Sequence, residues 1–305
     1  MTHDRAPTEP AAATIRFGPA GWSYSDWAGI VYPAPKPKGF DSLAYLARYF
    51  DAIEVNSTFY RPATPEVAQS WLRRVEDRPD FRFTAKLWRR FTHERQHGWT
   101  ADEVRHARAA FDVLHAGGRL SAVLLQFPWS FRRSDESREW LDDVVHAFRD
   151  FPLVLEVRHG SWNTPEFFRE LSERGIGFVN IDQPVFRDSV APSAVSTAPV
   201  GYVRVHGRNY QDWWRKDASP AARYDYLYPA DELQPWAARV REIASQPGTQ
   251  QVFVVTNNHF RGKGVANALM LKSMVEGTEV PAPPALFGEY AGVLRGFARP
   301  AEADA

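Results

Sequence analysis

The sequence predicts a single (β/α)8 barrel of the TIM type, and three observations lead to this fold class. Eight short apolar runs recur along the chain, a helical pattern follows most of them, and polar side chains gather where the runs end. Strands that alternate with helices form a parallel sheet, and eight such units close most economically as a barrel. A doubly wound open sheet is the alternative that this pattern leaves open.

The predicted strands are rich in Val, Ile, Leu and Phe, which is typical of strands buried on both faces of a parallel sheet. Their lengths of four to eight residues also favour strands over helices. The runs cover residues 15–20, 52–56, 81–86, 122–127, 153–158, 177–182, 201–206 and 251–257.

Helical periodicity lies between these runs, at residues 41–50, 65–77, 101–116, 135–149, 165–174, 231–245 and 262–276. Thr64 and Thr164 each precede a proline and Ser134 precedes two acidic residues, and both arrangements are typical of a helix start. Gly117 and Gly118 indicate a helix stop. Residues 183–200 carry Pro, Ser and Ala without a helical period, so the sixth crossover is expected to lack a regular helix.

The chain has 305 residues, of which 44% are hydrophobic, and it contains no Gly- or Ser-rich linker. A core of that size suits one large domain. We therefore expect a disordered N-terminal tail at residues 1–14, a barrel domain at 15–297 and a C-terminal tail at 298–305.

Charge and cysteine content exclude several classes of protein. Basic and acidic residues number 37 each, which argues against a protein that coats nucleic acid or membrane by bulk charge. The absence of cysteine excludes disulfides and thiolate metal sites. No signal peptide or membrane-length apolar run is present, so a cytoplasmic protein without a membrane partner is expected. The oligomeric state is not determined by the sequence.

Polar residues at the strand ends predict a site. In a barrel, the carboxyl ends of the strands and the loops after them form the mouth. Side chains alternate between the two faces of a strand, so residues two apart point to the same side. This alternation sends inward Glu54, Asn56, Thr84, Lys86, Gln126, Glu156, Arg158, Asn180, Asp182, Arg204, His206, Thr256 and Asn258.

Neighbouring strands suggest how these charges are paired. Lys86 on the third strand is expected to neutralise Glu54 on the second, and Arg158 on the fifth is expected to meet Asp182 on the sixth. The inward-pointing polar side chains allow two interpretations. They either line a functional cavity, which the polar ends of seven strands favour, or satisfy only one another as a buried polar plug.

The loops after the third, seventh and eighth strands are basic and contain Arg89, Arg90, Arg95, Arg208, Arg215, Lys216, Arg261 and Lys263. Loops that follow strands also hold Trp22, Trp27, Trp88, Trp99, Trp129, Trp162, Trp213 and Trp214. A basic mouth concentrates anions, and arginine with aromatic residues suits phosphates, sugars or unstacked bases.

Two sets of residues could in principle hold a metal ion. HERQH at 93–97 matches the H-E-x-x-H pattern of zinc proteases, but it lies in a basic loop rather than on an apolar helix, so we reject it. A divalent cation held by Glu54, Glu156, Asp182, His206 and His259 is disfavoured, because Lys86, Arg158 and Arg204 share that inner face. No metal site and no cofactor is predicted.

Eight segments carry a resemblance to a known family: FGPAGWSYSDWAGIVYP, FDAIEVNSTFYRP, FRFTAKLWRRFTHE, LLQFPWSF, LEVRHGSW, YVRVHGRN, YDYLY and NNHFRGKGVANALML. They run in order across residues 15–276, and in them the chain resembles the YecE-like family, the domain-of-unknown-function family 72. The resemblance implies a TIM barrel with a site at these motifs, but it implies no reaction. Pro19-Ala20 and Trp129 depart from the residues often found there in the family.

The function expected from the site is acid–base catalysis on an anionic substrate that is phosphate-bearing, sugar-like or nucleic-acid-like. The catalytic candidates are Glu156, His206, Glu54 and Asp182. The substrate-binding candidates are Asn56, Lys86, Gln126, Arg158, Arg204, Arg208, Asn257, Asn258, His259 and Lys263. Hydrolysis, elimination and isomerisation all remain open. The alternatives are a protein that binds single-stranded nucleic acid without catalysis, a metal-dependent phosphoesterase-like enzyme, and a scaffold that binds a protein partner.

Overall fold

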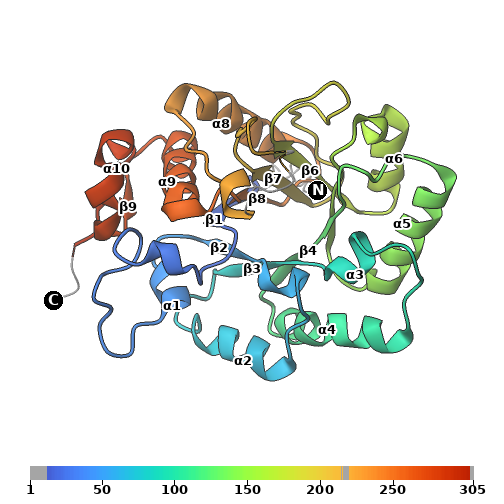
Figure 1. The fold of residues 1–305 in the computed structure, drawn as a ribbon, viewed down its shortest axis with the longest axis horizontal. Coiled ribbons are helices and arrows are strands. Elements are labelled where there is room, and N and C mark those ends of the chain that lie inside the picture. The colour runs from blue at the N-terminus through green and yellow to red at the C-terminus, as the bar shows by residue number, and fades with distance from the viewer. Residues whose placement is uncertain (1–11, 214, 216–219, 303–305) are drawn as a thin grey trace, which may run out of the picture.

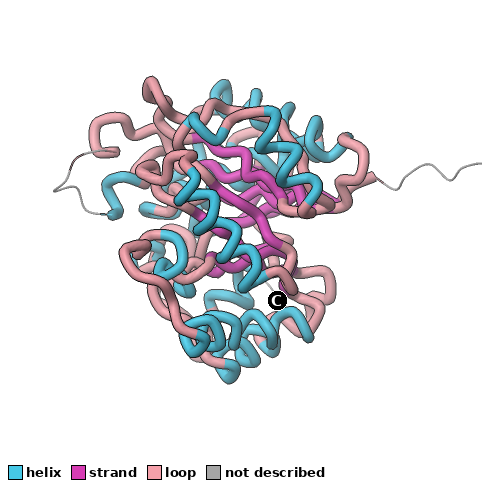
Figure 2. The backbone as a smooth tube through the Cα atoms, turned by 90° about the vertical axis from the view of Figure 1, so that its right-hand side faces the viewer, coloured by secondary structure: helices cyan, strands magenta, loops and turns pink. Residues whose placement is uncertain are grey.

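A computed structural model describes residues 12–213, 215 and 220–302. Eight parallel strands stand in the order β1-β8-β7-β6-β5-β4-β3-β2, and helices surround them (Figures 1 and 2). The strands are β1 (Thr14–Pro19), β2 (Ala52–Val55), β3 (Arg82–Lys86), β4 (Leu120–Gln126), β5 (Leu153–Glu156), β6 (Gly177–Asp182), β7 (Val200–Val205) and β8 (Gln251–Thr256). The predicted eight-stranded α/β barrel is confirmed.

Strands β1 and β2 lie at the two ends of this order, and their contact nearly closes the barrel. Ala20 and Glu54 form a parallel bridge, and the amide of Gly21 donates to the Glu54 carbonyl at 2.8 Å. Gly18 permits the approach, because a Cβ atom on it would lie 1.7 Å from the carbonyl oxygen of Ala52. An open sheet would leave these two edges apart, so their contact excludes the open-sheet alternative.

Substitution of Gly18 is therefore expected to destabilise the fold. Gly18→Ala would force β1 away from β2 and lower the free energy of unfolding by about 3 kcal/mol. The control is Gly98→Ala, because a Cβ on Gly98 would meet nothing within 4 Å. Urea denaturation measures both variants, and equal stability of the two would contradict this account of closure.

Helices lie between the strands in the chain, and most of the longer ones cover the outside of the barrel (Figure 1). They are α1 (Ser42–Leu46), α2 (Pro65–Arg73), α3 (Arg89–Thr92), α4 (Ala101–Ala116), α5 (Asp135–Phe148), α6 (Pro165–Glu173), α7 (Pro220–Arg223), α8 (Ala230–Ser245), α9 (Lys263–Glu276) and α10 (Phe287–Leu294). No helix in the described part of the chain is both long and apolar enough to cross a membrane.

The predicted helix starts are confirmed by their caps. The side chains of Thr64, Ser134 and Thr164 each accept a hydrogen bond from a backbone amide of the helix that follows, and Gly117 caps the end of α4. The first predicted helix was too long, because α1 ends at Leu46. Residues 183–199 contain no helix, so the irregular sixth crossover is also confirmed.

The sequence did not predict the small unit at the C-terminal end. Strands β9 (Val280–Ala282) and β10 (Ala298–Pro300) form a separate parallel pair, with α10 between them in the chain. This unit packs on α9, which explains why α9 is buried around most of its circumference. Strand β10 falls within the predicted C-terminal tail, and residues 1–11 of the predicted N-terminal tail lie outside the described residues.

Candidate functional site at the barrel mouth

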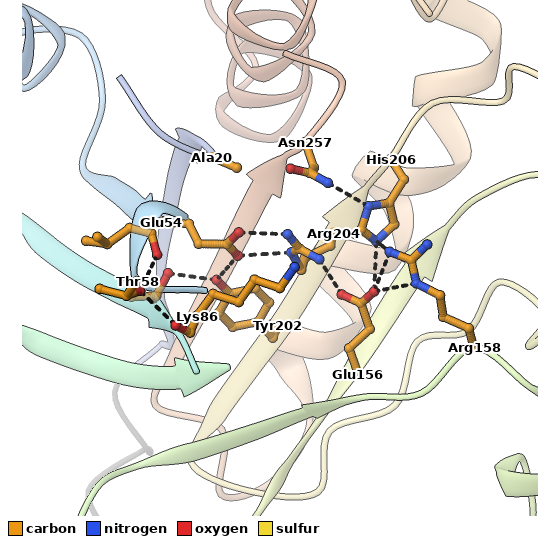
Figure 3. Close-up of polar contacts among 12 residues, drawn as sticks. Ala20, Glu54, Thr58, Lys86, Glu156, Arg158, Tyr202, Arg204, His206 and Asn257 are labelled. Carbon is orange, nitrogen blue, oxygen red and sulfur yellow. Dashed lines mark hydrogen bonds and ion pairs between the residues drawn. The ribbon is translucent and has the colours of Figure 1, made fainter. Parts of the chain in front are cut away.

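Arg204 of β7 stands at the centre of a buried polar network inside the barrel (Figure 3). Its Nε and Nη2 atoms donate to the two carboxylate oxygens of Glu54, at 2.9 and 2.7 Å. Its Nη1 atom donates to Glu156 on β5. The guanidinium thus bridges two carboxylates from strands that are not neighbours in the barrel, and all three side chains are almost fully buried.

The second oxygen of Glu156 is also occupied. It accepts from Nε of Arg158 at 3.0 Å and lies 3.1 Å from Nε2 of His206. The amide nitrogen of Asn257 lies 3.1 Å from Nδ1 of His206. These two contacts fit a neutral imidazole that donates from Nε2 and accepts at Nδ1, while Nη2 of Arg158 lies farther from Nε2, at 3.4 Å. Burial lowers the pKa of His206 to about 3, which agrees with that neutral form.

Tyr202 and Thr84 complete the network below Arg204. The Tyr202 hydroxyl donates to Glu54 at 3.0 Å, so its single proton is used there. The Thr84 hydroxyl, at 2.7 Å, must then be the donor to Tyr202. Burial and the Glu54 charge both raise the pKa of Tyr202 well above its usual value.

The charges of the network balance without Lys86. Glu54 and Glu156 supply two negative charges, and Arg204 and Arg158 supply two positive ones. Although burial alone would raise the pKa of Glu156, Arg204, His206 and Arg158 hold it well below its usual value.

Lys86 at the end of β3 therefore has no carboxylate of this network left to neutralise its ammonium group. Its ammonium lies 3.7 Å from the centre of the Phe59 ring, and among the described residues it forms no ion pair. Burial lowers the pKa of Lys86 to about 7, and the positive charge of Arg204 acts in the same direction. An amine with this pKa is substantially neutral at physiological pH.

A pocket of about 480 Å³ opens above this network, and Lys86 and Arg158 belong to its wall. The remaining lining residues are Phe59, Tyr60, Arg89, His93, Gln126, Pro128, Trp129, Gln183, Ser189, Trp213, Arg223 and Tyr224. They come from the segments that follow β2 to β7, so the pocket lies at the carboxyl ends of the strands, as barrel architecture predicts.

The sixth crossover forms one wall of the pocket. It contributes Gln183 and Ser189, and backbone hydrogen bonds join it to the segment after β5. The amide of Val190 donates to the Arg158 carbonyl at 3.0 Å, and the amide of Gly160 donates to the Asp188 carbonyl at 2.7 Å. These bonds hold the wall in place without a helix.

The structure separates the predicted site residues into four groups. Glu54, Glu156, Arg158, Arg204, His206 and Asn257 belong to the buried network. Lys86, Gln126 and Arg158 line the pocket. Asn56 and His259 line a second pocket of about 450 Å³, while Asp182, Arg208, Asn258 and Lys263 are held by other partners.

Both predicted ion pairs were wrong. Arg204, rather than Lys86, occupies both oxygens of Glu54, and Arg208, rather than Arg158, binds Asp182 at 2.9 Å. For Asp182, the prediction considered only strand residues, whereas Arg208 lies in the loop after the neighbouring strand β7. For Glu54, the prediction compared only adjacent strands. A long arginine side chain crosses the interior of a narrow barrel and reaches a carboxylate on the far side, which adjacency along the sheet does not reveal.

Most of the basic loop residues are neutralised outside the pocket. Lys263 pairs with Asp225, Arg261 with Glu289, and Arg215 with Asp212. Arg89 stays in the pocket wall, although Glu94 lies 2.8 Å from its Nε atom. Trp214 and Lys216, two other residues of these loops, lie outside the described residues.

Several pocket residues were not predicted as site residues. Trp129 and Trp213 were noted as loop tryptophans, and Trp213 packs over Arg158 with its ring centre 5.5 Å from the guanidinium carbon. His93 was not predicted as a site residue, because it belongs to the H-E-x-x-H match that the sequence context excludes. Phe59 lies in one of the family segments but was not singled out, and nothing in the sequence indicated Arg223, because both positions depend on how the loops fold over the barrel.

The described residues give no support to a metal centre. They contain no group of three or more His, Cys, Asp or Glu side chains arranged to hold a metal ion. Residues 93–97 are not helical, so His93 and His97 do not share a helix face as H-E-x-x-H requires.

Comparison with known proteins agrees with this architecture. The family described as "Protein of unknown function DUF72" matches residues 16–286. The chain belongs to this family. A relative in Bacillus subtilis, the UPF0759 protein YunF, is 27% identical over 277 residues, which cover 86% of this chain and 95% of YunF. The UPF0759 protein YecE of Escherichia coli K12 is 26% identical over 204 residues, or 66% of each chain.

Solved structures of the DUF72 family share the fold. A family member from Thermotoga maritima superposes with a TM-score of 0.73 at 29% identity, covering 86% of this chain and 99% of its own. One from Enterococcus faecalis gives a TM-score of 0.74 at 23% identity, covering 86% and 96%. The predicted YecE-like resemblance is therefore confirmed, and the comparisons add the fold but no reaction.

Proposed function

We propose that this DUF72 protein is an enzyme that acts on a small anionic molecule bound in the mouth pocket. One observation carries the proposal. Lys86, Arg89, Arg158 and Arg223 line the pocket, and no carboxylate is among its described lining residues. Glu94 and Glu156 pair with Arg89 and Arg158 from outside the pocket, but a wall whose described residues carry three guanidinium groups and no carboxylate favours an anionic ligand.

The donors in the pocket suit a phosphate or a carboxylate. Arginine binds such groups through paired N–H donors, and this fork geometry is the strongest common form of anion recognition. Nε of Arg223 is buried without a hydrogen-bond partner, which leaves a donor available near the pocket. Arg158 is held by Glu156 on one side and Trp213 on the other, so its orientation is fixed before a ligand arrives.

The rest of the wall suits the uncharged part of such a molecule. Tyr60, Trp129, Trp213 and Tyr224 present aromatic surfaces, while Gln126, Gln183 and Ser189 present amide and hydroxyl groups. Aromatic faces with a few polar groups are typical of sugar and metabolite sites, and about 480 Å³ is within the usual range for them.

The buried network is assigned a supporting role in this proposal. Glu156 and His206 are fully buried and lie behind Arg158, so they orient that guanidinium rather than contact the ligand. Lys86 and His93 line the pocket itself. Burial lowers the pKa of His93 to about 3, so its imidazole is neutral and able to form a hydrogen bond with a bound ligand.

Thermal stability in the presence of anions tests the proposal. Inorganic phosphate or a sugar phosphate at 100 times its dissociation constant is expected to stabilise the protein by about 2.7 kcal/mol, a shift of a few degrees. Arg89→Gln is expected to weaken binding about tenfold or more, because it removes a pocket cation. Arg89 is preferred to Arg158 for this test, since Arg158→Gln would also unpair buried Glu156.

Arg105→Gln provides the matched control, because Arg105 is an exposed arginine of α4 that does not line the pocket. Equal shifts in the wild type and Arg89→Gln would contradict the pocket as the anion site. No shift with any anion, but a shift with a divalent cation, would favour the metal-dependent alternative. Tight binding of a single-stranded oligonucleotide that weakens steeply with salt would favour the nucleic-acid-binding alternative.

A further inference from the structure

Lys86 is the buried titratable group whose arrangement the proposed function leaves unexplained. The network below it is already neutral, because Arg204 and Arg158 match Glu54 and Glu156. A cation needed only for charge balance would have a carboxylate of its own. Lys86 has the Phe59 ring against its ammonium and faces the pocket.

A hydrogen bond to its backbone and the burial of its side chain determine where the Lys86 amine lies. The hydroxyl of Thr58 donates to the Lys86 carbonyl at 2.7 Å, which ties the end of β3 to the turn after β2. The side chain then extends along the inner face of the barrel, and only 9% of the residue is exposed (Figure 3). Its end is therefore presented to the pocket rather than to bulk solvent.

The charges that face Lys86 come from every neighbouring element. Arg204 on β7 and Arg158 after β5 disfavour its protonated form, while Glu156 on β5 and Glu54 on β2 favour it. His93, after α3, also faces it. The carboxylates are committed to the arginines, so burial dominates and favours the neutral amine.

We propose that Nζ of Lys86 is a nucleophile that forms a Schiff base with the carbonyl carbon of an anionic aldehyde or ketone, an inference that rests on the proposed anion pocket. A neutral lysine amine in a partly apolar cavity is the usual reagent for such a step. The pocket cations Arg89 and Arg223 would hold the phosphate or carboxylate of the substrate, and Lys86 would meet its carbonyl group.

The step balances without an oxidant or reductant. The lone pair of Nζ forms a bond to the carbonyl carbon, the electron pair of the C=O π bond moves to oxygen, and a proton passes from nitrogen to that oxygen. The resulting carbinolamine takes up a second proton and loses water, which leaves a C=N bond and an iminium cation. The iminium then serves as an electron sink for proton abstraction or carbon–carbon bond cleavage next to it.

Reductive trapping tests the inference. The probe is pyridoxal 5′-phosphate, an anionic aldehyde, followed by sodium borohydride and peptide mass mapping. Lys86 is expected to carry the reduced adduct, which adds the mass of the probe less one oxygen atom. At pH 8 its initial labelling rate is expected to exceed that of the exposed Lys38 at least about tenfold, because a pKa of about 7 leaves most of the Lys86 amine neutral.

Two variants and a second probe separate the explanations. Lys86→Arg keeps the positive charge but not the amine and is expected to lose the adduct, whereas Lys38→Arg is expected to keep it. Pyridoxal without the phosphate is expected to label Lys86 more slowly. Equal labelling by both probes would support the nucleophile and contradict the anion pocket. Labelling confined to exposed lysines would overturn the nucleophile, and the anion pocket would still stand if phosphate stabilises the protein.

Discussion

Arg204→Met is expected to lower the free energy of unfolding by about 3–5 kcal/mol, the usual effect of removing one partner from a buried ion pair. Arg204 is almost fully buried and is the guanidinium that holds both oxygens of Glu54. Its loss would leave that carboxylate inside the barrel without its cation. Chemical denaturation of the wild type and the variant measures the difference.

A compensating variant tests whether charge balance is the cause. Glu54→Gln combined with Arg204→Met removes one negative and one positive charge, and it leaves Glu156 paired with Arg158. The double variant is expected to be more stable than Arg204→Met alone. Arg169→Met serves as the control for loss of an arginine, since Arg169 is an exposed residue of α6. A double variant less stable than the single one would show that lost packing, rather than unpaired charge, is responsible.

Lys86→Met is expected to have the opposite effect and to stabilise the protein, by up to about 4 kcal/mol at pH 7. The pKa of Lys86 falls from 10.5 to about 7 on folding, so the unfolded chain binds more protons between these values. The free energy of unfolding of the wild type therefore rises with pH between 7 and 10.5. The methionine variant has no amine at this position, so it lacks this pH dependence. The advantage of the variant should grow as the pH falls from 10.5 to 7 and then level off.

Urea denaturation at several pH values between 7 and 10 measures this difference, with Lys38→Met as the control for an exposed lysine. A Lys86→Met variant that is less stable than the wild type at pH 7 would contradict an uncompensated buried amine. The expected result has a functional meaning. A residue that destabilises the fold is typical of an active site, where function rather than stability determines the side chain.

Much of the site could be predicted from the sequence because strand periodicity is a local property. Alternation along β2, β3, β5 and β7 was enough to place Glu54, Lys86, Glu156 and Arg204 on the inner face, and the structure confirms that they meet there. The inward polar residues were expected to form either a functional cavity or a buried polar plug, and each expectation describes part of the barrel. Glu54, Glu156 and Arg204 form a buried polar plug, while Lys86 and Arg158 also line a cavity above it.

The sequence by itself determined the eight strands, the irregular sixth crossover and the inward polar face, because each depends on periodicity or turn chemistry within a few residues. Only the tertiary structure decided which charges pair, since Arg204 reaches Glu54 and Glu156 across the barrel interior. It also decided which loop residues line the pocket, such as Arg223 and His93. Those contacts depend on the three-dimensional path of the chain, and that path leaves Lys86 as the one pocket-lining lysine among the described residues.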